Sequence, residues 1–173
     1  MKSTGIVRRI DELGRIVIPK EIRKNLKIKD GEPLEIFINQ SEIILKKFSN
    51  MSDMERNFND YVNIINDITG NNILITDRDK VISCNQKIIS YKDKAIGDDI
   101  EDLLEMRTPI LVNKIKSLLI TQDESIKTNY YIIPLIVNSD VSGLIIMLSK
   151  NEINDNEKNV LDIVSKLITR QLE

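Results

Sequence analysis

Residues 5–26 read GIVRRIDELGRIVIPKEIRKNL, and this stretch decides how the N-terminal part of the chain folds. Side chains alternate along residues 6–10, with isoleucines and an arginine on one face, and residues 15–18, an arginine followed by three apolar residues, form the return partner. Gly14 can supply the positive φ that the connection over residues 11–14 needs. The pattern therefore predicts a β-hairpin that is rich in cations.

A short helix is expected directly after this hairpin. Pro19 lacks the N–H that a strand ladder requires, but it suits the first turn of a helix. Ile22 and Leu26 are four residues apart, so we expect them on the buried face of that helix. Alternating residues over 34–38 predict a further strand, and residues 42–47 are expected to form the next one.

The N-terminal module is too small to be comfortably stable alone. It holds four predicted strands and one helix within residues 1–48, and units of this size usually depend on a disulfide, a metal or another subunit. The lone Cys84 cannot close an intrachain disulfide, and the chain contains no His to bind zinc. Dimerisation is the remaining route to stability.

Charge is distributed unevenly over the 173 residues. Residues 1–48 hold 11 Lys+Arg against 7 Asp+Glu, a net +4, whereas residues 49–173 hold 14 against 20, a net −6. A basic end on a chain of ordinary globular composition is a candidate surface for nucleic acid.

The inventory of residues excludes several other classes of function. The absence of His excludes a His-dependent hydrolase, and neither GxxxxGK[ST] nor GxGxxG occurs, so we expect no metal and no cofactor. Arg8 and Arg9 interrupt any signal peptide, and the longest apolar run, 130–137, is far shorter than the roughly 20 residues that span a bilayer. We expect a cytoplasmic, nucleoid-associated protein with no membrane partner.

Residues 2–48 resemble the AbrB family of swapped-hairpin transcription factors, nearly without gaps. The motif elements that carry this resemblance stand in the family's order at residues 4–8, 11–15, 17–19, 34–36 and 43–47. The resemblance implies that two chains interlace their hairpins into one small β-barrel. It also implies that DNA is contacted by Arg8, Arg15, Arg23 and Lys24, with Arg9 as an addition.

Double-stranded DNA is the expected ligand of these five cations. A single exposed arginine is usually only solvated, but a dimer would present about ten such cations near one surface and would release counterions on binding. Lys24 stands where some relatives have Arg, and an ammonium suits a phosphate contact better than base readout. Since Phe37 and Phe48 are the only aromatic residues before residue 50, stacking on single strands is disfavoured and shape readout is favoured.

The remainder of the chain predicts an α+β domain. Apolar residues at spacings of three and four predict a helix over 51–69, which begins near Ser49 or Ser52 and docks on its own domain, on a partner helix, or on both. Further predictions are a hairpin of strands 73–77 and 81–84, helical stretches over 100–106 and 110–119, strands 130–137 and 143–149, and a closing helix that begins at Asn154 or Asp155.

The order of elements from 132–137 to 142–147 resembles a GAF domain. This resemblance implies either a sensor that binds a small molecule or a dimerisation scaffold without a ligand, and the effector is unknown. The predicted fold is therefore α+β, with a dimeric AbrB-like barrel over 1–50, a linker and oligomerisation helix over 51–69, and a GAF-like domain over 56–173.

We expect a homo-oligomeric transcription factor, similar to sporulation regulators, in which the helices 51–69 and 155–173 pair the larger domains into a tetramer. Two alternatives stay open. An antitoxin that neutralises a toxin uses the same barrel, although it usually ends in a short unfolded tail. An enzyme would need Cys84 or a carboxylate pair as its active group, but a Cys beside apolar residues is more often inert. The carboxylates of residues 98–102 could be read as a metal cluster, but acidic residues near a helix start are favoured by the helix dipole.

Overall fold

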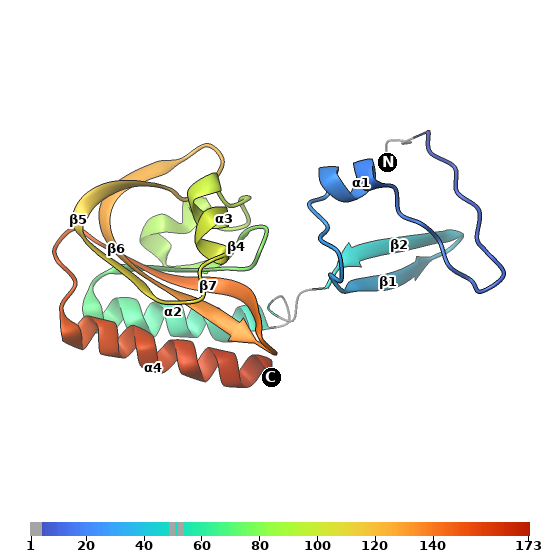
Figure 1. Cartoon of the computed structure of the whole chain (residues 1–173). Coiled ribbons are helices and arrows are strands. Elements are labelled where there is room, and N and C mark those ends of the chain that lie inside the picture. Colours follow the sequence, from blue (N-terminus) through green and yellow to red (C-terminus); the bar gives the residue numbers. More distant parts are fainter. Residues whose placement is uncertain (1–4, 49–50, 52–53) are drawn as a thin grey trace. The chain divides into compact units, whose positions relative to one another are not determined.

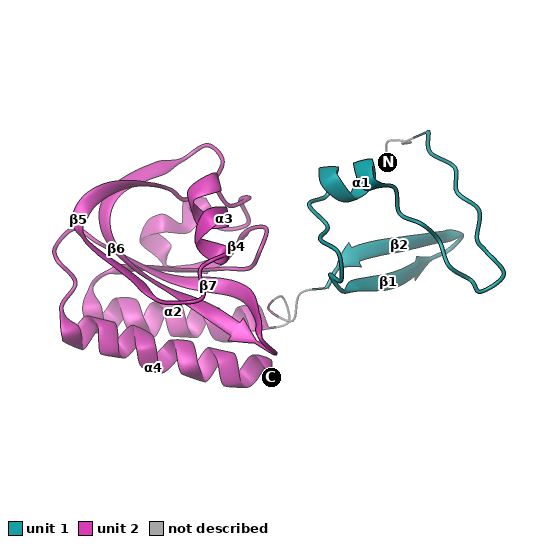
Figure 2. Cartoon of the chain, viewed as in Figure 1, with its two compact units in different colours: residues 1–48 teal, residues 49–173 magenta. Residues whose placement is uncertain are grey.

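The structure, a computed structural model, describes residues 5–48, 51 and 54–173. It divides into two compact units, Met1–Phe48 and Ser49–Glu173 (Figure 2). Each unit has its own secondary structure.

Within residues 5–48, the first unit contains one helix and one β-hairpin. Helix α1 (Lys20–Asn25) follows Pro19, and strands β1 (Leu34–Asn39) and β2 (Glu42–Lys47) pair antiparallel along their whole length. The predictions of this helix and of these two strands are confirmed.

The predicted hairpin before α1 is not formed in the single chain. Residues 5–18 contain no strand, and they run out from the unit as a long loop that is closed only by a turn (Figure 1). Val7 is 84% exposed and Val17 is 73% exposed. The two arms could pair only with each other, and a two-stranded hairpin with no third strand or covered face is marginally stable in water. The prediction of two strands here is wrong for the isolated chain.

No residue described within 5–48 is buried. The expected buried face of α1 is therefore also wrong for one chain, because Ile22 is only half-buried and Leu26 is exposed. The described branched apolar side chains of this unit are half-buried at best, and many of them are exposed.

The second unit is a five-stranded antiparallel sheet in the order β4-β3-β7-β6-β5, with helices on both faces. Helices α2 and α4 cover one face, and α3 lies on the other (Figure 1). The bounds of these elements are α2 (Glu55–Thr69), β3 (Asn72–Thr76), β4 (Val81–Cys84), the 3-10 segment η2 (Gln86–Tyr91), α3 (Asp98–Leu104), β5 (Ile110–Leu119), β6 (Ser125–Val137), β7 (Asp140–Ser149) and α4 (Asp155–Leu172).

Successive residues of the central strands point to opposite faces of the sheet, and their side chains pack into two separate apolar cores. On β6, Tyr131 and Ile133 face α2 and α4, whereas Tyr130 and Ile132 face the layer of η2 and α3. Because the sheet is covered on both faces, its strands are apolar nearly throughout, which is why they were predictable from sequence.

Helix α2 begins at Glu55, later than the predicted start at Met51, and it ends at Gly70 in a left-handed conformation (φ 72°). Met51 is nevertheless fully buried in the core with Phe58 and Ile65. The predicted seam therefore docks largely on its own domain. The capping residues proposed at Ser49 and Ser52 lie outside the described residues.

Residues 110–119 form strand β5, so the predicted helix there is wrong. The predicted hairpin of β3 and β4, strands β6 and β7, and a helix overlapping residues 100–106 are confirmed. Helix α4 begins as predicted, since Asn154 forms a capping box with Glu157.

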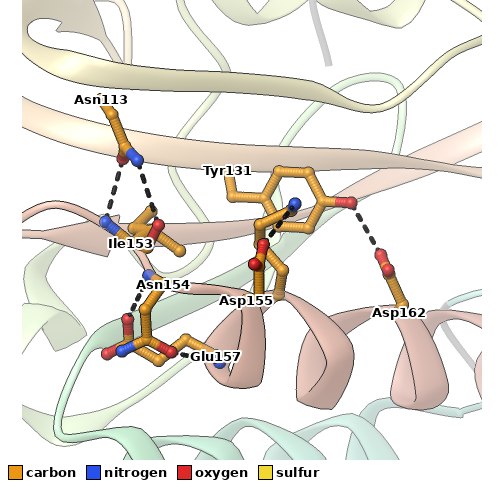
Figure 3. A network of polar contacts seen from close by, with 8 residues as sticks. Asn113, Tyr131, Ile153, Asn154, Asp155, Glu157 and Asp162 are labelled. Atoms are coloured by element: carbon orange, nitrogen blue, oxygen red, sulfur yellow. Dashed lines mark hydrogen bonds and ion pairs between the residues drawn. The ribbon is translucent and has the colours of Figure 1, made fainter.

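A polar network joins edge strand β5 to the start of α4 (Figure 3). The Asn113 side chain accepts a hydrogen bond from the Ile153 backbone N–H at 2.9 Å and donates to the Ile153 carbonyl at 3.0 Å. Glu157 in turn accepts a bond from the Asn71 side chain at 2.7 Å. The first turn of α4 is therefore tied both to β5 and to the segment that follows α2.

Across the part of the chain that the structure describes, no helix is long and apolar enough to span a membrane.

Candidate nucleic-acid interface

The turn between residues 11 and 15 is built around the side chain of Asp11. Its Oδ1 accepts hydrogen bonds from the backbone N–H groups of Leu13 (3.0 Å) and Arg15 (2.8 Å). The backbone closes the turn with bonds from Gly14 N to Asp11 O (3.0 Å) and from Asp11 N to Arg15 O (3.1 Å). Gly14 has φ 75°, which a residue with a side chain rarely adopts. Aspartate is favoured at such a position because its carboxylate satisfies nearby N–H groups.

The same carboxylate holds Arg15. Arg15 Nε lies 2.7 Å from Asp11 Oδ2, while the arginine side chain remains 71% exposed. The backbone N–H of Arg15 and then its side chain lower the pKa of Asp11 below its usual range. Asp11 is therefore ionised at neutral pH, and it holds Arg15 at Nε while the rest of the guanidinium is exposed to solvent.

Arg8 and Arg9 lie on the loop that precedes this turn, and both are exposed. Arg8 Nη1 donates to the backbone carbonyl of Val7 at 3.2 Å. Neither arginine forms an ion pair with a carboxylate of the described residues. Their charges are free to meet an external anion.

Arg23 and Lys24 lie in the last turn of α1, and they differ in their surroundings. Lys24 is exposed, whereas Arg23 is half-buried and its Nη1 forms an ion pair with Asp30 Oδ1. The Nε atom of Arg23 is buried and has no hydrogen-bond partner among the residues that the structure describes. Arg23 thus links α1 to the loop before β1, and contact with DNA would compete with Asp30.

The structure divides the five predicted cations between two places in the first unit. Arg8, Arg9 and Arg15 belong to the loop around the turn, and Arg23 and Lys24 belong to α1 (Figure 1). Sequence reasoning missed the two carboxylates that hold arginines, Asp11 and Asp30. An Asp four residues before an Arg, with a Gly between them, was the available signal for the first of these pairs.

Cys84, considered for catalysis, and Asp99, from the run considered as a metal cluster, both form structural hydrogen bonds. The Cys84 thiol donates to the Ile88 carbonyl (3.3 Å), and burial raises its pKa, which makes the nucleophilic thiolate scarcer. Asp99 Oδ2 accepts a hydrogen bond from the backbone N–H of Leu119 (2.7 Å). The acidic run therefore fixes the end of β5 at the start of α3.

Comparison with known proteins identifies the family. A family model described as the C-terminal part of stage V sporulation protein T, a transcription factor, matches residues 53–173. Stage V sporulation protein T of Bacillus subtilis (strain 168) is 36% identical over 177 residues, which cover 100% of this chain and 99% of that protein. The chain belongs to the stage V sporulation protein T family.

Members of the stage V sporulation protein T family are transcription factors rather than enzymes, and this chain is a sporulation-type transcriptional regulator. Its N-terminal part is 58% identical over 48 residues to the transition state regulatory protein AbrB of Bacillus subtilis (strain 168), covering 28% of this chain and 50% of AbrB. A second family model matches residues 7–50, and it describes MazE, a bacterial antitoxin that takes part in antidote-toxin recognition.

The fold of the larger part is that of a GAF domain. The GAF domain of a phosphoenolpyruvate-protein phosphotransferase from Acinetobacter superposes with a TM-score of 0.57 at 10% identity, covering 73% of this chain and 84% of that one. The expectation of an α+β chain with an AbrB-like module and a GAF-like domain is confirmed.

Proposed function

We propose that this regulator binds double-stranded DNA as a homo-oligomer, with Arg8, Arg9, Arg15, Arg23 and Lys24 as the contacting cations. The observation that carries the proposal is a basic unit that exposes four of these cations, half-buries the fifth, Arg23, and yet buries none of its described residues. Residues 1–50 are then the DNA-binding domain, and they fold by interlacing with a second copy.

Association of the larger domains would extend this dimer to a tetramer. The two helices on the outer layer of the second unit leave apolar side chains exposed, Ile64 and Ile68 on α2 and Ile163 and Leu167 on α4. In this arrangement the helix within 51–69 is both a linker and part of an oligomer contact, and residues 56–173 form the GAF-like domain.

Salt dependence of binding tests the DNA proposal. Fluorescence anisotropy of a labelled random duplex should show affinity that falls steeply with salt, with a slope of about −0.9 for each phosphate neutralised. The variant Arg15→Ala should lower both the affinity and the slope. Lys114→Ala, an exposed cation of the second unit, is the matched control and should change neither.

A salt slope near zero, or an Arg15→Ala variant that binds as tightly as the wild type, would contradict the proposal.

Localisation follows from the proposed DNA binding, because a protein that binds the chromosome through these cations resides in the cytoplasm on the nucleoid.

The GAF-like domain serves in this proposal as an oligomerisation unit that can also sense a small molecule. Such sensing requires that the effector bind two states of the oligomer with different affinity. Compounds that raise the melting temperature of the second unit identify candidate effectors, and they should then change DNA affinity. If DNA affinity is unchanged when such a compound is bound, the sensing role is contradicted and the domain acts only as an oligomerisation scaffold.

The match of residues 7–50 to an antitoxin model supports a second candidate function, neutralisation of a toxin. Ser49–Glu173 form a compact folded unit here rather than an unfolded tail, which favours the regulator. Purification of the tagged chain from its own cells separates the two functions, because an antitoxin would carry a stoichiometric toxin.

A further inference from the structure

We propose that Asp11 is a positioning residue, which holds the Arg15 guanidinium by its inner nitrogen so that the outer edge reads a guanine in the major groove. The inference rests on the proposed DNA-binding function and assigns the source of sequence preference within it.

The geometry of the ion pair leaves the reading edge of Arg15 free. Asp11 binds through Nε, the nitrogen nearest the aliphatic stem, and neither Nη of Arg15 has a partner among the described residues. The two Nη groups form the outer edge of a planar fork. Guanine O6 and N7 are two adjacent acceptors that match such a fork, and this is the commonest specific contact in the major groove.

Fixing the side chain in advance favours base readout. A free arginine loses rotamer freedom when it binds, which costs about 1 kcal/mol, whereas an arginine already held by a carboxylate has lost that freedom beforehand. Asp11 is itself held by the N–H groups of Leu13 and Arg15, so the turn backbone aims the guanidinium.

The other four cations lack this arrangement. Arg23 has the reverse geometry, because its outer nitrogen Nη1 is bound to Asp30. Arg8, Arg9 and Lys24 have no carboxylate partner among the described residues, and they suit phosphate contacts, which position a protein without reading sequence. Arg15 is therefore assigned the sequence-reading role.

The two carboxylate oxygens of Asp11 have separate tasks, which makes the inference testable by one substitution. Oδ1 closes the turn and Oδ2 holds Arg15. Asn in place of Asp keeps an oxygen that can accept the turn hydrogen bonds, but it replaces the anionic oxygen by an NH₂ group that cannot bind Nε. Asp11→Asn thus releases Arg15 while preserving the turn.

The experiment uses the full-length protein and duplexes selected by it from a random pool. For the selected duplex, Asp11→Asn and Arg15→Lys should each lower affinity about 10-fold. For an unrelated duplex, Asp11→Asn should bind as well as the wild type or better, since the variant is one charge more positive. Circular dichroism and sizing verify that each variant keeps its fold and oligomeric state.

Asp30→Asn is the matched control, because it also removes one carboxylate from an arginine of the same unit. It should change affinity for both duplexes equally and leave their ratio unchanged. Replacing single guanines of the selected duplex by 7-deazaguanine, which lacks the N7 acceptor, should weaken wild-type binding at one position of each half-site and have no effect there on Asp11→Asn.

An unchanged ratio of the two affinities in Asp11→Asn overturns the positioning role while leaving DNA binding intact. Failure of the wild type to bind any duplex overturns the proposed function itself, and this inference with it.

Discussion

Tyr131 connects strand β6 to helix α4 by a hydrogen bond from its hydroxyl to Asp162 Oδ1 at 2.7 Å (Figure 3). Burial, and then this bond to an anion, raises the pKa of Tyr131 well above its ordinary value near 10. Burial also raises the pKa of Tyr91 and Tyr130. All three phenols stay protonated in the folded unit at pH values where unfolded tyrosines ionise.

These tyrosines predict a loss of stability at alkaline pH. A group whose pKa is higher in the folded state stabilises the fold fully below the unfolded pKa, and this contribution disappears as pH rises from about 10 toward the folded value. The free energy of unfolding should therefore decline above about pH 10. Tyr131→Phe should make that decline shallower, and at pH 7 it should cost about 1.5 kcal/mol through the lost bond.

Urea unfolding of the full chain, followed by circular dichroism from pH 7 to pH 11, measures both effects. Tyr61→Phe is the control, since Tyr61 also bonds a side chain of α4, the Gln171 amide (2.9 Å), but is only partly buried. An equally steep alkaline decline in Tyr131→Phe would contradict the assignment.

Strand β5 is held in the sheet on one side only, and Asn113 provides its link to α4. The ladder to β6 is irregular between Val112 and Lys116, which is where the Asn113 side chain bonds the backbone of Ile153. The Asn113 side-chain amide thus donates and accepts one hydrogen bond each with the Ile153 backbone, as a neighbouring strand residue would.

Removal of this amide should loosen the start of α4. Asn113→Ala loses two hydrogen bonds to the Ile153 backbone, which should cost about 2 kcal/mol and speed amide hydrogen exchange over residues 153–158. Lys114→Ala, an exposed neighbour on the same strand, should leave the exchange unchanged. Equal exchange in the two variants would show that α4 is held by its capping box alone.

The irregularity of β5 also explains why its strand character was not predictable from sequence. A bulge breaks the alternation of apolar and polar residues, and the interrupted pattern of 110–119 resembles a helical period. The central strands were predictable because both of their faces are covered. The Asn113 contact spans 40 residues of sequence, so no local pattern reveals it. The Asp11–Arg15 pair is local, and its spacing of four residues around Gly14 is visible in the sequence.

At the scale of the whole molecule, the exposed apolar side chains of α2 and α4 bear on the proposed assembly of several chains. Ile68 of α2 is 65% exposed and Ile163 of α4 is 68% exposed, on helices joined by the Tyr61–Gln171 bond. Apolar side chains of this size on adjacent helices indicate an association surface.

Charges placed on this surface should separate the larger domains. The double variant Ile68→Glu and Ile163→Glu should convert a tetramer to a dimer in light scattering, because burying two unpaired carboxylates in an apolar contact is costly. Asn156→Glu at the exposed first turn of α4 is the control, which adds negative charge where the helix dipole favours it. An unchanged mass of the double variant would place the contact elsewhere.

The first unit buries none of its described residues, and under the proposed interlaced dimer the amount of protein in a cell becomes a regulatory input. If the DNA-competent form exists only as a pair of chains, its abundance at low levels follows the square of the chain concentration. Halving expression then reduces the competent form to about a quarter. A gene controlled by such a regulator would respond more than proportionally to the supply of the regulator, even with no signal molecule present.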